Sequence, residues 1–435
     1  MKIIVIGAGL SGLTAALRLR QRGHEVLVVE AQAHAGGRCK AVRRDGFLID
    51  TCPELAASSY RRWLALIDEV GLGGELVDCP SVMSMLRDGR LIDIDLAKPW
   101  TLAATPLLSW RAKLALLRGL WRLRGPLRAV PHYLLDDVRL DDPHNNARAV
   151  AMRAFGAEVT DLLLEPLLRP IGGVTLDMMS SLMVPYTLSD WSRMVTLRGG
   201  LDSLPKALAE RLPVRYGSSV HRVHADSAGV RLDVHEAGGG TAELRADKCL
   251  ITAPYDQAEA MYPRLAELAG DYRQTMQFMR MIDVKLAYGR PTRSRAACVM
   301  LSTQASRDIN VVSLAHNKCA DRAPPGHALF SVFTEHKEYA RLAAMADDDL
   351  VAMLAAQVEA LYPEVRGALL FSRVARQERV SYVPDAGFFH RTRRLWDAVG
   401  TDPRVQLGGD IFMFGGMEAA VASGERAAAR LAQAH

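Results

Sequence analysis

The sequence lacks the cysteine pairs that bind metals or build a disulfide framework. Its six cysteines are scattered, and no two form a Cys-x-x-Cys pair. They are Cys39, Cys52, Cys79, Cys249, Cys298 and Cys319. We therefore predict no metal site, no disulfide framework and a reduced, cytoplasmic setting.

Long apolar runs are also absent. No stretch of the 435 residues reaches the roughly 18 uninterrupted apolar positions of a membrane-spanning helix. The apolar first ten residues contain glycines, and Glu25 and Glu30 follow too soon for a secretory leader. The formal charge of +5 is small for this length, which argues against an overall nucleic-acid-binding surface. The length predicts two or three domains.

What is present begins with a dinucleotide-binding pattern. Lys2 to Ile6 is typical of a buried parallel strand, and Gly7, Gly9 and Gly12 follow in the order Gly-x-Gly-x-x-Gly. Residues 13–22 have the apolar periodicity of a helix. Gly7 permits a tight turn, Gly9 lets a pyrophosphate approach the backbone, and Gly12 lets the helix pack on the strand.

A second predicted strand ends in an acid suited to a ribose. Glu25 to Glu30 is apolar between its two acids, and Glu30 lies 18 residues after Gly12. A carboxylate there accepts hydrogen bonds from ribose hydroxyls. The start of the intervening helix offers unpaired N–H groups to phosphate, and Leu10 and Ser11, between the glycines, are further cofactor-binding candidates.

Gly36, Gly37 and Arg38 come shortly after Glu30. This resembles the extension of flavoproteins in the amine oxidase, protoporphyrinogen oxidase and phytoene desaturase superfamily. In that family the extension wraps the pyrophosphate of FAD, so Arg38 would give phosphate charge-assisted hydrogen bonds. The resemblance implies that the dinucleotide is FAD.

The other end of the chain resembles the C-terminal FAD signature of the same superfamily. The signature covers Val405 to Ala427, with Gly409 and Asp410 followed by a glycine loop and a helix. The resemblance implies that Asp410 meets the ribityl chain, and that Gly416 and Met417 lie at the isoalloxazine ring. No cysteine lies near this motif, so we expect non-covalent FAD.

The middle of the chain resembles the family in two further segments. Residues 195–208 resemble the segment that re-enters the FAD domain, and residues 248–253 resemble its return strand. Val214 to Val223 resembles the family's strand whose valine backbone pairs with adenine, and the resemblance implies that Val220 makes this contact.

These resemblances imply an α/β protein with a Rossmann-like FAD-binding domain and an inserted α+β substrate domain, the two-domain architecture of amine oxidases. The FAD-binding domain would be discontinuous and comprise residues 1–60, 196–265 and 396–435. The substrate-binding domain would comprise residues 61–195 and 266–395.

Lys285 is the candidate catalytic residue. It lies inside the predicted strand Met281 to Tyr288, among apolar neighbours. In the amine oxidase branch a strand lysine often holds a water near flavin N5 and assists the reaction with oxygen. A buried lysine is costly unless it is paired or hydrated, which favours such a use. Alternatively, Lys285 and Asp283 share a solvated face of the strand.

Gly416 departs from the amine oxidase pattern. Amine oxidases usually line the flavin face with two aromatic rings, and one comes from the residue before the Met-Glu pair. In this sequence that residue is Gly416. The departure weakens the simple amine oxidase interpretation and makes room for a bulkier substrate.

Residues 96–135 form a basic amphipathic segment that contains no acid. Trp100, Trp110 and Trp121 are interleaved with cations, and a helical wheel separates a Trp and Leu face from an Arg face. The seven cations are Lys98, Arg111, Lys113, Arg118, Arg122, Arg124 and Arg128. The pattern is typical of an interfacial membrane segment, and a solvated helix face with an oligomer contact is the alternative. No nucleic-acid motif accompanies it.

We therefore expect an FAD-dependent oxidoreductase. The resemblance implies dehydrogenation of a C–C or C–N bond by hydride transfer to flavin N5, and we favour a lipophilic or polycyclic small molecule over other substrates. One alternative is an amine oxidase that acts on a small amine with O2. The other is a non-redox binding protein on the same scaffold. O2 or another acceptor would reoxidise the flavin. A homo-oligomer and peripheral contact with the inner face of a membrane remain open.

Overall fold

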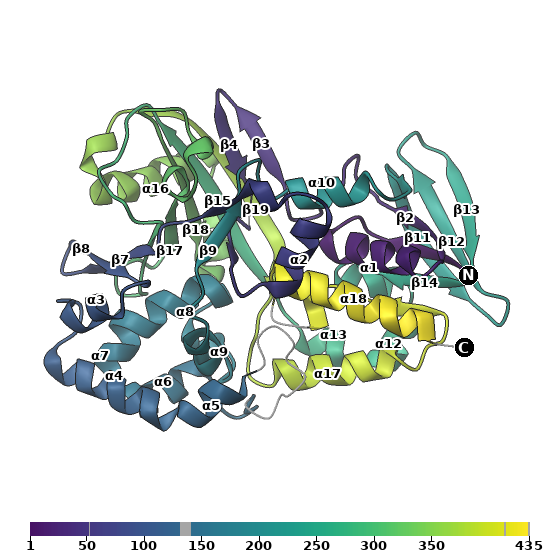
Figure 1. Cartoon of the computed structure of the whole chain (residues 1–435), viewed down its shortest axis with the longest axis horizontal. Helices are drawn as coiled ribbons and strands as arrows, with labels where there is room; N and C mark the ends of the chain where they lie inside the picture. Colours follow the sequence, from purple (N-terminus) through teal and green to yellow (C-terminus); the bar gives the residue numbers. More distant parts are fainter. Residues whose placement is uncertain (52, 131–140, 413–414, 434–435) are drawn as a thin grey trace.

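The computed structural model of the chain describes residues 1–51, 53–130, 141–412 and 415–433. Two sheets organise these residues, with a group of helices beside them (Figure 1). Cys52 lies outside the described residues, and the five cysteines within them are buried and free. No helix of the described ranges combines the length and apolar composition needed to cross a bilayer.

The first sheet is parallel and carries the dinucleotide motif. Its strands, in order across the sheet, are β10 (Val214–Arg215), β2 (Glu25–Val29), β1 (Lys2–Ile6), β14 (Lys248–Ile251) and β20 (Val405–Leu407). The central strand β1 is apolar after its first residue because it is buried on both faces of the sheet. Segments from both ends and the middle of the chain therefore meet in one sheet.

Two helices from opposite ends of the chain pack together against this sheet. Helix α1 (Leu10–Gln21) follows β1, and α18 (Met417–Gln433) ends the described chain. A Cβ at Gly424 of α18 would collide with the backbone oxygen of Ser11, so the glycine permits the close approach. This contact brings the two predicted FAD motifs side by side.

The predicted strand of residues 214–223 is wrong in its extent. The structure divides it into β10, in the parallel sheet, and β11 (Ser218–Ala225), in a separate antiparallel sheet with β12 (Val230–Glu236) and β13 (Thr241–Ala246). Gly217 lies between the two pieces with a φ of +63°. The chain turns at this glycine, so the residues after it enter another sheet.

The second large sheet has seven strands. In order they are β19 (Leu369–Tyr382), β15 (Phe278–Tyr288), β18 (Ala328–Thr334), β17 (Ile309–Leu314), β16 (Cys298–Met300), β7 (Val82–Arg87) and β8 (Arg90–Asp95). Alternate residues of β15, such as Val284 and Leu286, pack with Leu350 and Leu354 of α16 (Asp347–Leu361). The residues between them, among them Lys285, therefore face the opposite side of the sheet.

A group of helices forms the part of the molecule farthest from the two termini (Figure 1). They are α3 (Pro99–Ala104), α4 (Trp110–Arg122), α5 (Arg124–Ala129), α6 (Ala147–Phe155), α7 (Ala157–Val159), α8 (Glu165–Gly172) and α9 (Met183–Ser189). Arg169 is buried in α8 and pairs with Glu335 at 2.7 Å. Because the pair crosses from α8 to the segment after β18, it ties the helices to the seven-stranded sheet.

Short elements connect these parts. Two small sheets contain β3 (Ala41–Arg44) and β4 (Phe47–Asp50), and β5 (Ala56–Ala57), β9 (Met194–Leu197) and β6 (Leu76–Asp78). The remaining helices are α2 (Arg61–Glu69), α10 (Ser203–Ala209), α11 (Tyr255–Met261), α12 (Arg264–Ala269), α13 (Tyr272–Thr275), α14 (Ala315–Lys318), α15 (Tyr339–Ala343) and α17 (Phe388–Val399).

Candidate functional site

The carboxyl ends of β1 and β2 carry the first set of predicted site residues. Gly7 turns the chain with a φ of +102°, and its N–H donates to the Val29 oxygen at 2.8 Å. The buried carboxylate of Glu30 accepts hydrogen bonds from the N–H groups of Ala8, at 2.6 Å, and Gln32, at 2.8 Å. These bonds fix the Glu30 side chain at the strand end, where a ribose-binding acid is expected.

The three glycines of the motif have different surroundings. A Cβ at Gly12 would collide with the Gly7 oxygen, so Gly12 serves the packing of α1 on β1. A Cβ at Gly9 would meet nothing within 4 Å. Gly36 forms an isolated bridge with Gly9, and a Cβ at Gly37 would lie 3.2 Å from the Gly9 Cα. The extension therefore lies beside Gly9 and leaves open space next to it.

The N-terminus of α1 faces the C-terminal motif. Leu10 and Ser11 are buried in its first turn, and the Ser11 hydroxyl has no hydrogen-bond partner among the described residues. A Cβ at Gly408 would lie 3.4 Å from this hydroxyl, whereas a Cβ at Gly409 would meet open space. The open spaces at Gly9 and Gly409, the free hydroxyl and the helix N-terminus fit the pyrophosphate of a dinucleotide.

Arg38 and Asp410 are brought together from opposite ends of the chain. Two nitrogens of the Arg38 guanidinium donate to the two Asp410 carboxylate oxygens, each at 2.8 Å, and one also donates to the Val380 oxygen at 2.7 Å. The adjacent Asp410 carboxylate raises the pKa of the Arg38 guanidinium above its ordinary value. Arg38, which was predicted to contact phosphate, is therefore paired with Asp410, which was predicted to contact the ribityl chain.

Strand β11, which contains Val220, begins beside Glu30. The N–H of Ser218, which begins β11, donates to the Glu30 backbone oxygen at 2.9 Å. Val220 is buried two residues further along β11 and pairs with Val234 of β12. A base bound beside Glu30 would therefore have β11 as its neighbour.

The segment around Gly416 and Met417 joins α18 to α2. Met417 is buried at the start of α18, and the next carboxylate, Glu418, accepts hydrogen bonds from the N–H groups of Arg62, at 3.0 Å, and Trp63, at 2.8 Å. Glu418 thus caps the N-terminus of α2. Sequence analysis quoted this Met-Glu pair but missed the cap.

An aromatic residue stands beside the glycine that departs from the amine oxidase pattern. A Cβ at Gly416 would lie 3.5 Å from the hydroxyl of Tyr60, which immediately precedes α2. Sequence analysis missed Tyr60, because no motif connects it with the C-terminal signature. Among the described residues, a tyrosine hydroxyl from another part of the chain therefore lies within 4 Å of this position.

Lys285 belongs to a buried ionic cluster, so its placement on a solvated face is wrong. The residue is 1% exposed. The ammonium donates to Glu54 Oε1 at 2.6 Å and to Ser331 Oγ at 2.9 Å, and lies 3.1 Å from Asp283 Oδ2. An ammonium has three N–H groups, and here three acceptors surround it. The ammonium of Lys285 is therefore a positive charge held in a fixed position.

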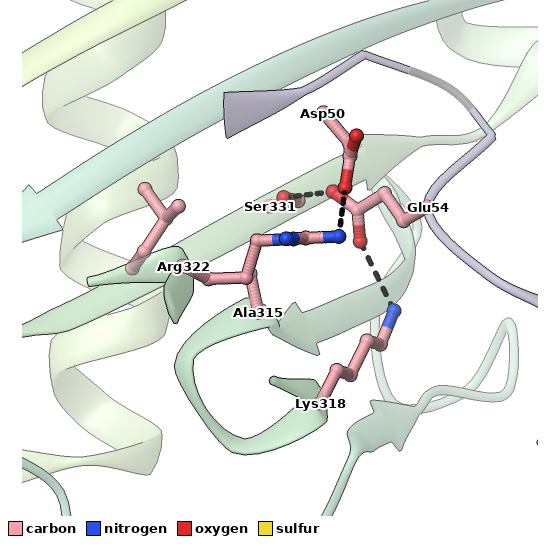
Figure 2. A pocket seen from close by; sticks show the side chains of 7 residues that line it. Asp50, Glu54, Ala315, Lys318, Arg322 and Ser331 are labelled. Carbon is pink, nitrogen blue, oxygen red and sulfur yellow. Dashed lines mark hydrogen bonds and ion pairs between the residues drawn. The ribbon is translucent and has the colours of Figure 1, made fainter. Parts of the chain in front are cut away.

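Glu54 is the centre of this cluster, as Figure 2 shows for the part beside a small pocket. Besides Lys285, it accepts hydrogen bonds from Lys318 of α14, at 3.0 Å, from Ser313, at 2.6 Å, and from Ser331. Burial raises the pKa of Glu54, but the two ammonium groups outweigh burial and hold it well below its ordinary range. Glu54 is thus a buried, charged carboxylate.

A second ion pair, between Arg322 and Asp50, lies next to the Glu54–Lys318 pair in Figure 2. Arg322 contacts the Asp50 carboxylate at 2.8 Å, and the other Asp50 oxygen accepts a hydrogen bond from the Leu201 N–H at 3.0 Å. Burial raises the pKa of Asp50 to about 6 against the lowering effect of Arg322. Three acids and three cations therefore share one interior region: Asp50, Glu54, Asp283, Lys285, Lys318 and Arg322.

Sequence analysis found only part of this cluster. Lys285 and Asp283 were found because they are two residues apart in a predicted strand and so share a face. Glu54, Lys318 and Arg322 were missed, because no motif connects them with that strand. The only signal was a charged residue that lies between apolar ones, and that signal does not identify a partner.

Asp283 makes the folding stability of the protein depend on pH. Burial raises the pKa of Asp283 to about 6 despite the ammonium of Lys285, compared with about 3.9 in an unfolded chain. Between these values the folded state retains a proton that the unfolded state releases, so stability falls as the pH rises from about 4 to 6. Asp283→Asn cannot ionise and should reduce this fall by about 2–3 kcal/mol.

Urea unfolding of wild type and Asp283→Asn at pH 4.5 and 7.5 measures this difference. Asp348→Asn, which changes an exposed acid of α16, is the control and should follow wild type. Equal pH dependence in all three proteins would show that Asp283 titrates near its ordinary value.

The fold and the two converging motifs define a dinucleotide-binding protein. Residues 10–432 match the family described as flavin containing amine oxidoreductase, and the chain belongs to this family. It is an FAD-dependent oxidoreductase, with a Rossmann-like FAD-binding part and an α+β part in the two-domain architecture of amine oxidases.

The chain is similar to several characterised proteins of this type. The coproporphyrinogen III oxidase of Bacillus subtilis is 21% identical over 389 residues, which cover 80% of each chain. The mitochondrial protoporphyrinogen oxidase of Nicotiana tabacum is 32% identical over 170 residues, 38% of this chain and 31% of the relative. The solved cyclohexylamine oxidase of Brevibacterium oxydans shares the fold, with a TM-score of 0.73 and 19% identity over 99% of this chain and 98% of its own.

Proposed function

We propose that this enzyme dehydrogenates a C–C or C–N bond of a lipophilic or polycyclic small molecule, as an oxidase or desaturase. Gly416 carries this proposal, because a glycine stands where amine oxidases carry one of their two aromatic rings. The 21% identity to a coproporphyrinogen III oxidase over 80% of the chain supports it. The substrate of that relative is a macrocycle, which needs more room than a small amine.

The residues of the chain have separate tasks in this proposal. Bound FAD supplies the acceptor for the electrons of the dehydrogenated bond. The N–H groups at the start of α1 and the free Ser11 hydroxyl bind its phosphates, and Glu30 binds a ribose. Arg38, Val220, Asp410 and Met417 complete the cofactor site, which holds FAD without a covalent bond.

Lys285 is proposed to assist reoxidation of the flavin by O2. The contacts of its ammonium support a role as a fixed cation, because burial lowers the pKa of Lys285 but Asp283 and Glu54 raise it above its ordinary value. A cation that stays protonated stabilises negative charge that develops near it. In this proposal Glu54 and Asp283 are positioning residues.

A second candidate is oxidation of a small amine with O2. The observation that favours it is the strand lysine itself, which in the amine oxidase branch assists the reaction with oxygen. This candidate predicts hydrogen peroxide on turnover with a simple alkylamine.

The first test is the visible spectrum of the purified protein before and after acid precipitation. We expect a yellow protein whose colour stays in the supernatant. The flavin is then mixed anaerobically with coproporphyrinogen III, protoporphyrinogen IX or cyclohexylamine, and loss of its absorbance is followed. We expect a porphyrinogen to reduce it at least about tenfold faster than the amine, a difference of about 1.4 kcal/mol in barrier. Faster reduction by the amine would favour the second candidate.

A lipophilic substrate partitions into lipid, so peripheral contact of residues 96–135 with a membrane belongs to the same proposal. Such contact would let the enzyme take its substrate from the bilayer.

A further inference from the structure

Helix α4 (Trp110–Arg122) packs on the molecule through one side, which includes two small residues. Its buried side chains are Ala112 and Leu116, and Gly119 is buried between them and the helix end. A Cβ at Gly119 would collide with the Phe155 ring of α6, so the glycine lets the two helices approach. The orientation of α4 about its axis is therefore fixed by close packing.

The opposite side of α4 exposes its largest apolar residues. They are Trp110, Leu114, Leu117 and Trp121, which we call the α4 stripe, and their exposed fractions are 66%, 42%, 63% and 66%. The spacing of four, three and four residues places them in one line along the helix. Exposed apolar side chains gathered in one line mark a contact surface.

Cations border the α4 stripe. Arg111, Arg118 and Arg122 are exposed along one flank of the helix, and no ion pair is formed by them among the described residues. Residues 96–135 contain seven cations and no acid. In Figure 1, α3, α4 and α5 lie along the outer edge of the molecule, away from both termini. The surface is thus apolar at its centre and positive around it.

We infer that the α4 stripe docks on an anionic lipid bilayer, with its tryptophans and leucines in the interfacial region and the arginines at the headgroup phosphates. This inference rests on the peripheral contact included in the proposed function and names the residues and the lipid. Tryptophan favours the membrane interface because its ring is apolar and its N–H is polar. Each nearby cation adds attraction to an anionic surface.

Two other occupants fit the surface less well. A second copy of the chain, paired about a twofold axis, would bring the same cations face to face, which is repulsive. A nucleic acid would satisfy the arginines but would leave Leu114 and Leu117 without apolar partners. A bilayer satisfies both the apolar stripe and its charged border.

The test is flotation of the holoprotein with lipid vesicles. Wild type should bind vesicles of phosphatidylcholine with phosphatidylglycerol at least about tenfold more tightly than vesicles of phosphatidylcholine alone. Trp110→Ser combined with Leu117→Ser and Trp121→Ser should weaken binding to the anionic vesicles by more than about tenfold. Trp191→Ser removes another exposed tryptophan, outside α4, and should bind like wild type.

Charge is tested separately. Arg118→Gln combined with Arg122→Gln should weaken binding to anionic vesicles by about tenfold or more and leave binding to neutral vesicles unchanged. Retained yellow colour shows that each variant is folded holoprotein. Flotation needs no substrate, so its result does not depend on which substrate the enzyme oxidises. No binding of wild type, or equal binding by wild type and the triple variant, overturns the inference. A wild-type dimer that the triple variant dissociates would overturn it in favour of a second copy.

Discussion

Gly9→Val is expected to give a folded but colourless protein. A Cβ at Gly9 meets nothing within 4 Å, and the backbone there has a φ of −75° and a ψ of 172°, which valine adopts without strain. The added methyl groups would enter the open space beside the N-terminus of α1. That space is where we place the pyrophosphate of FAD, so the affinity for FAD should fall by more than about 100-fold.

Absorbance of the flavin after gel filtration measures the loss, and fluorescence titration of the apoprotein with FAD measures the affinity. Apoproteins are compared for stability, because bound FAD stabilises only the protein that binds it. We expect the two apoproteins to differ by less than about 1 kcal/mol in unfolding free energy. Gly74→Val is the matched control, since its Cβ also meets open space, and it should stay yellow. A yellow Gly9→Val protein would remove Gly9 from the cofactor site.

Gly12 is expected to behave differently from Gly9, although both belong to one motif. A side chain at Gly12 would collide with the Gly7 oxygen inside the packing of α1 on β1. Gly12→Val should therefore reduce folded yield, and any loss of colour would follow from loss of structure. The comparison distinguishes Gly9, which leaves space for the ligand in this proposal, from Gly12, which allows α1 to pack closely on β1.

Local motifs were predicted well because their geometry is set by neighbouring residues. The strand of residues 2–6 was predicted with the bounds that the structure has, and the helix after it begins three residues earlier than predicted. Glu30, predicted as the last residue of its strand, lies one residue beyond β2, because a strand, a tight turn and a helix of fixed length determine its position. The prediction failed for the strand of residues 214–223, where one glycine with positive φ ends the pairing.

Long-range contacts were harder to predict for a physical reason. Glu54 meets Lys285 across 231 residues and Lys318 across 264, and these contacts depend on where the segment between β4 and β5, which contains Glu54, lies against the seven-stranded sheet. Periodicity shows which residues share a face, but it does not show what that face meets. For α4 it separated an apolar from a basic side, whereas the small residues Ala112 and Gly119 decided which side is buried.

Lys285→Met is expected to lower the free energy of unfolding strongly. The change leaves Glu54 with one ammonium partner and Asp283 with none that the structure shows. Breaking a buried ion pair by removing one partner costs about 3–5 kcal/mol, so the unfolding free energy should fall by that amount. Asp283→Asn in the Lys285→Met background should recover part of the loss, because it removes the buried carboxylate that the first substitution leaves without an ammonium partner.

The same variant tests whether the cation acts on the flavin. If Lys285 assists the reaction with O2, Lys285→Met should slow reoxidation of the reduced flavin more than it slows reduction by substrate. Lys318→Met is the control, because Lys318 also contacts Glu54, at 3.0 Å, but projects from α14. Both variants should lose stability, and stopped-flow absorbance should show slow reoxidation only in Lys285→Met. Equal reoxidation rates in the two would assign Lys285 a structural role, since the cluster would then need its charge only to balance Glu54 and Asp283.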